Sequence, residues 1–170
     1  PATTFTDHIA MNLHGRESAH TIGVNPIGPR TAACPLIQDV LTALAYLRHV
    51  AGSDPIDLLG LKAAGIWCLM AAAVDDNISN TVIDIYGFDP DSSQDWNERM
   101  FIPLIRRAGG LETAVGLVAP ERLFLYNVSN DLIEDRLAKF YRASGSSEHL
   151  QIQRDSPTDE AIISWIGGPI

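Results

Sequence analysis

Apolar residues follow helical and strand spacing in turn over most of the chain from residue 35 onward. Over 35–51 they recur three and four positions apart behind a proline, which predicts a first helix that ends at Ala51 and Gly52. A short apolar run over 56–59 predicts a strand, and an alanine-rich stretch at about 63–74 predicts the helix after it. Strands and helices that alternate at short spacing are typical of a parallel sheet with crossover helices.

The same spacing predicts three more strands and three more helices. We expect the strands over 78–86, 122–128 and 150–153, and the helices over 111–117, 131–143 and from 156 onward. The segment 89–110 lacks clear periodicity and is long for a connection, which is typical of segments that line a binding site. The prediction is an α/β fold with about four parallel strands and flanking helices, in one domain over 35–170.

Residues 1–34 differ from this pattern. Gly23, Pro26, Gly28 and Pro29 interrupt any regular element there, so we expect a loop-rich N-terminal arm. The chain is thus expected to consist of this arm and the α/β domain that follows it.

Composition and charge narrow the classes of partner. The 170 residues are 46% hydrophobic and 19% charged, which is typical of a globular chain with one core. A formal net charge of -9 disfavours binding to nucleic acid or to an anionic membrane surface, and Arg106-Arg107 is the one basic doublet. No apolar run approaches the roughly 18 residues that a membrane-spanning helix needs. We therefore expect neither a nucleic-acid nor a membrane partner.

A tight turn over 60–65 holds the most informative position in the chain. Residues 55–65 predict a buried strand that runs into a glycine turn and then a helix, with Lys62 where the G-x-S-x-G nucleophile elbow carries its serine. In such an elbow a strained strand-to-helix turn lifts a hydroxyl above the carboxyl edge of a parallel sheet. The turn is present in this sequence, and the hydroxyl is absent.

Several stretches in the same order extend this likeness. They are Ile22-Gly23-Val24-Asn25 with 38–44, then 60–65, 82–88, 101–111 and 118–123. In them the chain resembles the acetyl-xylan-esterase-like, dienelactone-hydrolase-type branch of the α/β-hydrolase superfamily, over about residues 20–170. The resemblance implies a partial α/β-hydrolase-like three-layer fold that supplies the last four strands of an eight-stranded sheet, without the first strands or the oxyanion-hole loop. It also implies a carbohydrate ester or another small molecule as ligand.

A partial sheet of this kind would leave the strand over 56–60 with an unpaired edge. Unpaired backbone groups on an apolar edge strand are a site of association. We expect this edge to pair with a missing half of the domain, with a second copy in a homo-oligomer, or with the arm 1–34 folded back as an extra strand.

The catalytic residues of a hydrolase are mostly lacking. Lys62 occupies the nucleophile position, but an ammonium is no nucleophile at neutral pH unless its pKa is lowered, and a lysine whose stem covers apolar surface is the alternative. Asp131 occupies the acid position after the third parallel strand, where a carboxylate in the first turn of a helix also has a purely structural explanation. After the last strand come Arg154, Asp155 and Ser156, none of which shuttles protons as an imidazole does. His149 precedes that strand and is expected roughly 15–20 Å from the site.

No metal or cofactor motif is complete in this sequence. The cysteines, Cys34 and Cys68, match neither a disulfide framework nor a metal-ligand spacing, and Cys68 is expected to be a free thiol of the core. The arm carries five potential ligands whose spacing matches no zinc motif: Asp7, His8, His14, Glu17 and His20. Gly60 and Gly65 lack the third glycine of a dinucleotide fingerprint, and only Asp84 could serve as its ribose-binding acid. We assign no metal and no cofactor.

Three functions remain open for this sequence. The first is an α/β-hydrolase-like domain that is catalytically deficient and acts by binding or assembly. The alternative is a carboxylic ester hydrolase whose site is completed by a partner chain or a missing segment, or which works through Lys62 or a histidine of the arm. A nucleotide-binding or other α/β module is the third option.

Overall fold

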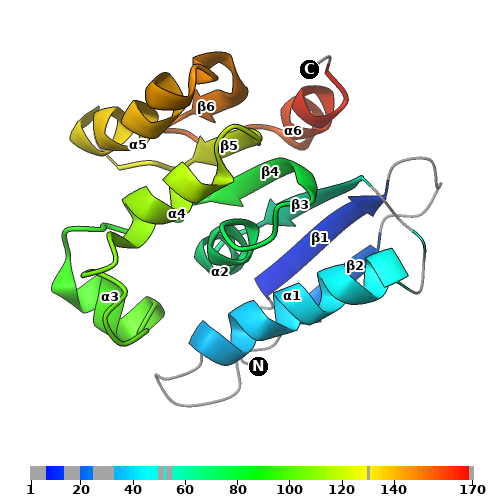
Figure 1. Ribbon diagram of the computed structural model, residues 1–170, viewed down its shortest axis with the longest axis horizontal. Coiled ribbons are helices and arrows are strands. Elements are labelled where there is room, and N and C mark those ends of the chain that lie inside the picture. Colours follow the sequence, from blue (N-terminus) through cyan, green and yellow to red (C-terminus); the bar gives the residue numbers. More distant parts are fainter. Residues whose placement is uncertain are drawn as a thin grey trace, which may run out of the picture.

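The protein forms a mixed six-stranded sheet with helices on both faces (Figure 1). The computed structural model describes residues 7–13, 20–24, 33–49, 52, 55–129 and 131–168, with only the backbone for 7–13, 20–24, 131 and 132. The strand order is β2-β1-β3-β4-β5-β6. The strands are β1 (Asp7–Leu13), β2 (His20–Val24), β3 (Ile56–Gly60), β4 (Ile78–Asp84), β5 (Arg122–Tyr126) and β6 (Leu150–Ile152). The last four are parallel to one another, which confirms the expected α/β fold with four parallel strands.

The helices divide unequally between the two faces of the sheet. They are α1 (Ala33–His49), α2 (Ala64–Ala72), α3 (Ser93–Arg99), α4 (Gly110–Val118), α5 (Asp131–Ser144) and α6 (Asp159–Ile166). The main core joins α1 to α5 with one face of the sheet, whereas α6 packs on the opposite face against Val82, Phe124 and Tyr126. Right-handed crossovers between successive parallel strands place the connecting helices on one face of the sheet. Because α6 covers the other face, the fold has three layers.

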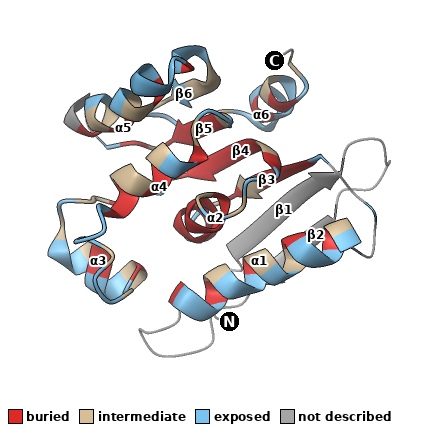
Figure 2. Ribbon diagram, in the orientation of Figure 1, coloured by how far each residue is buried: buried red, intermediate tan, exposed pale blue. Residues whose placement is uncertain are grey.

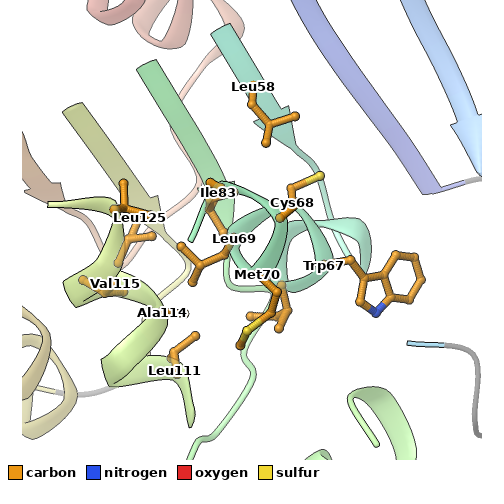
Figure 3. Close-up of a cluster of buried hydrophobic side chains, with 14 of the residues drawn as sticks. Leu58, Trp67, Cys68, Leu69, Met70, Ile83, Leu111, Ala114, Val115 and Leu125 are labelled. Carbon is orange, nitrogen blue, oxygen red and sulfur yellow. The ribbon is translucent and has the colours of Figure 1, made fainter. Parts of the chain in front are cut away.

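Helix α2 lies at the centre of the main core, and all nine of its residues are buried (Figure 2). Its side chains Cys68 and Leu69 point into the cluster that Leu58, Ile83 and others form with α4 (Figure 3). A helix that is apolar on every side has to be covered on every side, which explains why this one is placed between the sheet, α1 and α4. Helix α2 begins shortly after β3 ends, so the residues at its beginning determine how closely it approaches the strands.

The expected loop-rich arm is wrong over two stretches, because 7–13 and 20–24 are strands. Strand β1 pairs antiparallel with β3, with Ile9 opposite Gly60 and Leu13 opposite Ile56. The arm thus folds back as an extra strand, which is one of the three ways in which the edge of β3 was expected to pair. Because β1 of the same chain occupies this edge of β3, residues 56–60 have no unpaired edge at which a partner chain or a second copy could add a strand. Ala33 and Cys34, the last residues of the predicted arm, begin α1, and the remaining residues of the arm lie outside the described part of the structure.

The segment 89–110 is also more ordered than its sequence pattern indicated, because it contains α3. Ser92 caps this helix by accepting a hydrogen bond from the backbone N–H of Asp95 at 3.2 Å. Trp96 is buried, stacks edge-on against Phe88 with ring centroids 4.9 Å apart, and donates its indole N–H to the Pro90 carbonyl at 2.7 Å. Trp96 is the one buried residue of this short helix. A single apolar residue gives no helical periodicity in the sequence, which is why the pattern did not predict α3.

The last helix begins after Thr158, whose hydroxyl accepts from the Ala161 N–H at 3.3 Å, and not at Ser156 as the sequence pattern indicated. Among the described residues no helix has both the length and the apolar character needed to cross a membrane.

Candidate functional site

The carboxyl edge of the parallel sheet gathers the strained turns of this protein. The turn between β3 and α2 is tight: the N–H groups of Ala64 and Gly65 bond to the carbonyls of Leu61 and Lys62 at 3.2 and 3.0 Å. Lys62 at its apex has a φ of 53°, in the left-handed region. The strand–turn–helix arrangement predicted for this segment is therefore confirmed, with a strained lysine at its apex.

Two glycines make this turn sterically possible. A Cβ on Gly65 would lie 1.9 Å from the carbonyl oxygen of Asp84, and a Cβ on Gly60 would lie 2.7 Å from the Cβ of Cys68. Neither position has room for a side chain, so α2 can begin directly against β3 and β4 only with glycine at both. The glycines explain how the chain brings Lys62 above the edge of the sheet.

Strain recurs after the next two parallel strands. Tyr86 follows β4 with a φ of 51°, and Asn127 follows β5 with a φ of 58°. Left-handed backbone costs a residue other than glycine on the order of 1 kcal/mol or more, and it tends to cluster at functional sites. Among the described residues outside glycine, only Leu104 also has a positive φ. Three of the four such residues thus share one edge.

The carboxylate of Asp84 joins these three turns. Its Oδ2 accepts a hydrogen bond from the backbone N–H of Lys62 at 3.1 Å, and its Oδ1 accepts from the backbone N–H of Tyr86 at 2.8 Å and from Asn127 Nδ2 at 2.7 Å. Asp84 is only 6% exposed. Hydrogen bonds to a buried carboxylate are stronger than neutral ones, so this side chain offsets part of the strain in the turns around it.

A second row of contacts extends the site toward the loop after β6. The hydroxyl of Ser156 donates to Asn127 Oδ1 at 2.9 Å, which links this loop to the turn after β5. Tyr86 is half exposed, and the guanidinium of Arg99 lies 5.5 Å from its ring centroid and donates to its carbonyl at 3.2 Å. Lys62 and Tyr86 are therefore the two large exposed side chains directly beside Asp84.

Tyr126, at the end of β5, has its hydroxyl in a negative environment. Burial raises its pKa above the ordinary value, and the charges of Asp84 and Asp159 add to this rise. The phenol therefore stays protonated at neutral pH and cannot act as a base at this edge.

The other predicted site residues are only partly brought together. The backbone of Asp131 begins α5 after β5, as expected, and its side chain lies outside the described part of the structure. Asp84 is the carboxylate that contacts the elbow, whereas the sequence pattern indicated for it only the role of a ribose-binding acid. The signal for it was an acidic residue at the end of the strand next to the elbow strand.

Histidine is missing from this edge among the described side chains. His149 bonds through Nδ1 to the Pro120 carbonyl at 2.6 Å, at the amino ends of β5 and β6, where the sequence pattern placed it. His49 ends α1, next to Arg48, which pairs with Asp75 ahead of β4. Both imidazoles thus lie at the opposite edge of the sheet from Lys62.

The described backbone of the arm keeps two of its histidines apart. The register of β1 and β2 places His8 opposite Gly23 and His20 opposite Met11, so the two histidines are about 10 Å apart along the hairpin. His14 and Glu17 lie outside the described residues. Within the described ranges no group of three metal-ligating residues occurs. The backbone of β1 does reach the edge that carries Lys62, because Ile9 is opposite Gly60.

Comparisons with family models, with curated proteins and with solved structures found no match to this chain.

Proposed function

We propose that this chain is a catalytically deficient α/β-hydrolase-like domain that binds a small ligand, in the first instance a carbohydrate ester, at the carboxyl edge of its parallel sheet. The observation that carries the proposal is the elbow itself. Gly60 and Gly65 allow the close approach, Lys62 has a φ of 53°, and Asp84 holds the Lys62 N–H at 3.1 Å. A nucleophile elbow with an ammonium at its apex has the geometry for presenting a group to a ligand and lacks the hydroxyl for attack.

The exposed side chains at this edge suit an uncharged or anionic ligand that is rich in oxygen. The ammonium of Lys62 offers donors to an ester carbonyl or a hydroxyl, and the half-exposed ring of Tyr86 offers an apolar face to a sugar ring. Arg99 holds Tyr86 in place through its carbonyl and its ring. Because both residues flank Asp84, one ligand can reach both.

Hydrolysis would need a base and a nucleophile that the described residues of this edge do not supply. The hydroxyl of Ser156 donates to Asn127, and no described histidine side chain lies near it. Removing nucleophile and base together leaves only binding and residual electrostatic effects. Binding without turnover is therefore the expected behaviour.

The test compares the two lysines of the chain, Lys62 and Lys139. Lys139 on α5 pairs with Glu112 on α4 at 2.9 Å, away from the elbow. Lys139→Met is therefore a matched control for Lys62→Met. The purified protein is titrated with acetylated xylo-oligosaccharides and followed by thermal shift, and hydrolysis of p-nitrophenyl acetate is measured alongside. A bound ligand at one hundred times its Kd stabilises by about 2.7 kcal/mol. We expect this stabilisation in the wild type and in Lys139→Met, its loss in Lys62→Met, and equal background hydrolysis in all three.

Two results would overturn the proposal. Ester turnover that disappears in Lys62→Met and persists in Lys139→Met would show a catalytic lysine. Stabilisation that is the same in both variants would place the ligand elsewhere.

The alternative, an ester hydrolase completed by a partner chain or a missing segment, is favoured by one observation. The backbone of β1 runs to the same edge as Lys62, so a segment next to it could contribute a base there. Lys62→Ser tests this alternative, because it restores the hydroxyl on the elbow. A gain of ester turnover in Lys62→Ser would support a base supplied from outside the described residues, and no gain would support a binding domain.

A further inference from the structure

Two segments of the sequence match Asn-x-Ser, the acceptor pattern for N-linked oligosaccharides. They are Asn77-Ile78-Ser79, where β4 begins, and Asn127-Val128-Ser129, directly after β5. The pattern is short and also occurs by chance, so the surroundings of each asparagine have to distinguish a usable acceptor from an unusable one. A folded chain accommodates a bulky, solvated oligosaccharide only on a surface side chain that makes no structural contact, so the hydrogen bonds of the two amides decide between them.

Asn77 lies in the turn between α2 and β4, and its neighbours hold its backbone. Its N–H donates to Asp75 Oδ1 at 3.0 Å, and its carbonyl accepts from Arg48 Nη2 at 3.1 Å. Asp75 and Arg48 also pair with each other at 2.6 Å, so they fix the turn without using the Asn77 side chain. Asn77 is exposed, and its side-chain amide has no hydrogen-bond partner among the described residues. The amide is therefore free to be modified while the turn keeps its structure.

At Asn127 the side-chain amide is used at both ends. Its Nδ2 donates to Asp84 Oδ1 at 2.7 Å, and its Oδ1 accepts from the Ser156 hydroxyl at 2.9 Å. A sugar on Nδ2 would replace one of its two hydrogens and place a bulky ring beside a carboxylate that is only 6% exposed. Attachment there would break the contacts that join the turn after β5 to its neighbours.

We propose that Asn77 is an acceptor for an N-linked oligosaccharide and that Asn127 is not, although both match the pattern. In the transfer, Nδ2 of Asn77 attacks the anomeric carbon of an oligosaccharide carried on a polyprenyl diphosphate. A C–N bond forms, the C–O bond to the diphosphate breaks, the amide releases one proton, and the polyprenyl diphosphate leaves.

An oligosaccharide on Asn77 would leave the Lys62 edge of the sheet open. Strand β4 runs from Ile78, next to Asn77, to Asp84 at the carboxyl edge, and at about 3.3 Å per residue it spans roughly 20 Å. The inference is therefore independent of the function proposed for that edge.

The test is secretion of the full chain from a eukaryotic cell behind a signal sequence, with the two patterns removed one at a time. Ser79→Ala and Ser129→Ala each remove one pattern and leave both asparagines in place, so each variant is the matched control of the other. We expect one oligosaccharide per chain in the wild type and in Ser129→Ala, seen as a gel shift that peptide-N-glycosidase reverses. The shift should be lost in Ser79→Ala.

Peptide mapping of the wild type identifies the modified residue without a variant. Enzymatic release in ¹⁸O-labelled water converts a modified asparagine to labelled aspartate, and we expect the label at Asn77 alone. Label at Asn127, a gel shift that persists in Ser79→Ala, or wild-type protein secreted without any oligosaccharide would each overturn the proposal. If little protein is secreted, the same mapping is made on the chain retained in the cell, where an unmodified Asn77 would overturn it equally.

Discussion

Replacing Asp84 by asparagine should destabilise the whole carboxyl edge of the sheet, although it changes a single side-chain atom. Asp84 accepts three hydrogen bonds, one on Oδ2 and two on Oδ1. An asparagine has one acceptor oxygen, so its less costly orientation keeps the two bonds on Oδ1 and turns its NH₂ group toward the N–H of Lys62. Two donors then face each other at the turn that carries the strained lysine.

The size of the effect follows from these contacts. A hydrogen bond to a charged group contributes about 1.5–3 kcal/mol and a neutral one about 1 kcal/mol, so losing one bond and neutralising two amounts to about 3 kcal/mol at the lower end of these ranges. For a chain of this length that corresponds to a fall in Tm of roughly 6–12 °C. Native proteins are stable by about 5–15 kcal/mol, so the variant should still fold.

Urea unfolding followed by circular dichroism measures this change as a shift in midpoint at constant slope. Asp39→Asn, an exposed carboxylate on α1, is the matched control and should change the stability by less than about 0.5 kcal/mol. A loss below about 1 kcal/mol in Asp84→Asn, or an equal loss in the control, would refute the view that this carboxylate joins the three turns.

Three further predictions concern the elbow, the opposite edge and the core. Gly65→Ala should lower the free energy of unfolding by at least about 3 kcal/mol, because its Cβ would lie 1.9 Å from the Asp84 carbonyl oxygen. Gly87→Ala should lower it by only about 1 kcal/mol, because Gly87 has a positive φ and open space around it. Thermal unfolding compares the two variants, and equal losses would contradict the steric argument. Arg122→Met should loosen α6 and lower the free energy of unfolding by about 2–3 kcal/mol, because Arg122 donates to the Trp165 carbonyl at 2.8 Å and its guanidinium lies 4.3 Å from the Trp165 ring centroid. The expected sign is a red shift of tryptophan fluorescence before global unfolding. An unchanged emission spectrum and an unchanged unfolding midpoint would count against this prediction. Burial raises the pKa of the Cys68 thiol above its ordinary value of 9.0, so the unfolded chain loses this proton at a lower pH than the folded protein does. The contribution of the protonated thiol to stability is therefore complete below about pH 9 and should decrease as the pH rises further. Urea midpoints between about pH 7 and pH 10 should fall less in Cys68→Ala than in the wild type, and an identical fall in both proteins would be the contrary result.

The parallel half of the fold could be predicted because its signals are local. β3 and β4 each carry a pair of adjacent apolar residues that pack on opposite faces of the sheet, Leu58 with Leu59 and Val82 with Ile83, and a sequence displays such pairs without reference to any partner. The turn at Lys62 was visible for the same reason, since Gly60 and Gly65 lie within one segment. The strained φ of Lys62 then follows from the steric demands of that segment.

The hairpin of β1 and β2 and the helix α3 were missed because their stabilisation is not local. Strand β1 alternates Ile9, Met11 and Leu13 opposite β3, but its pairing spans about fifty residues, and the glycines and prolines that follow it obscure the pattern. Helix α3 depends on the packing of Trp96 against Phe88. Contacts of this kind are decided by the packed core and leave little trace in the spacing of residues.

The sequence by itself determined the four parallel strands, the helices between them and the placement of a lysine at the apex of a glycine turn, because these follow from periodicity and from steric rules within a few residues. Only the tertiary structure decided which carboxylate serves the site. Asp84 meets Lys62 across 22 residues and Asn127 across 43, and hydrogen bonds over such separations exist only once the strands lie side by side. The elbow could be read from the chain, and the side chain that holds it in place could not.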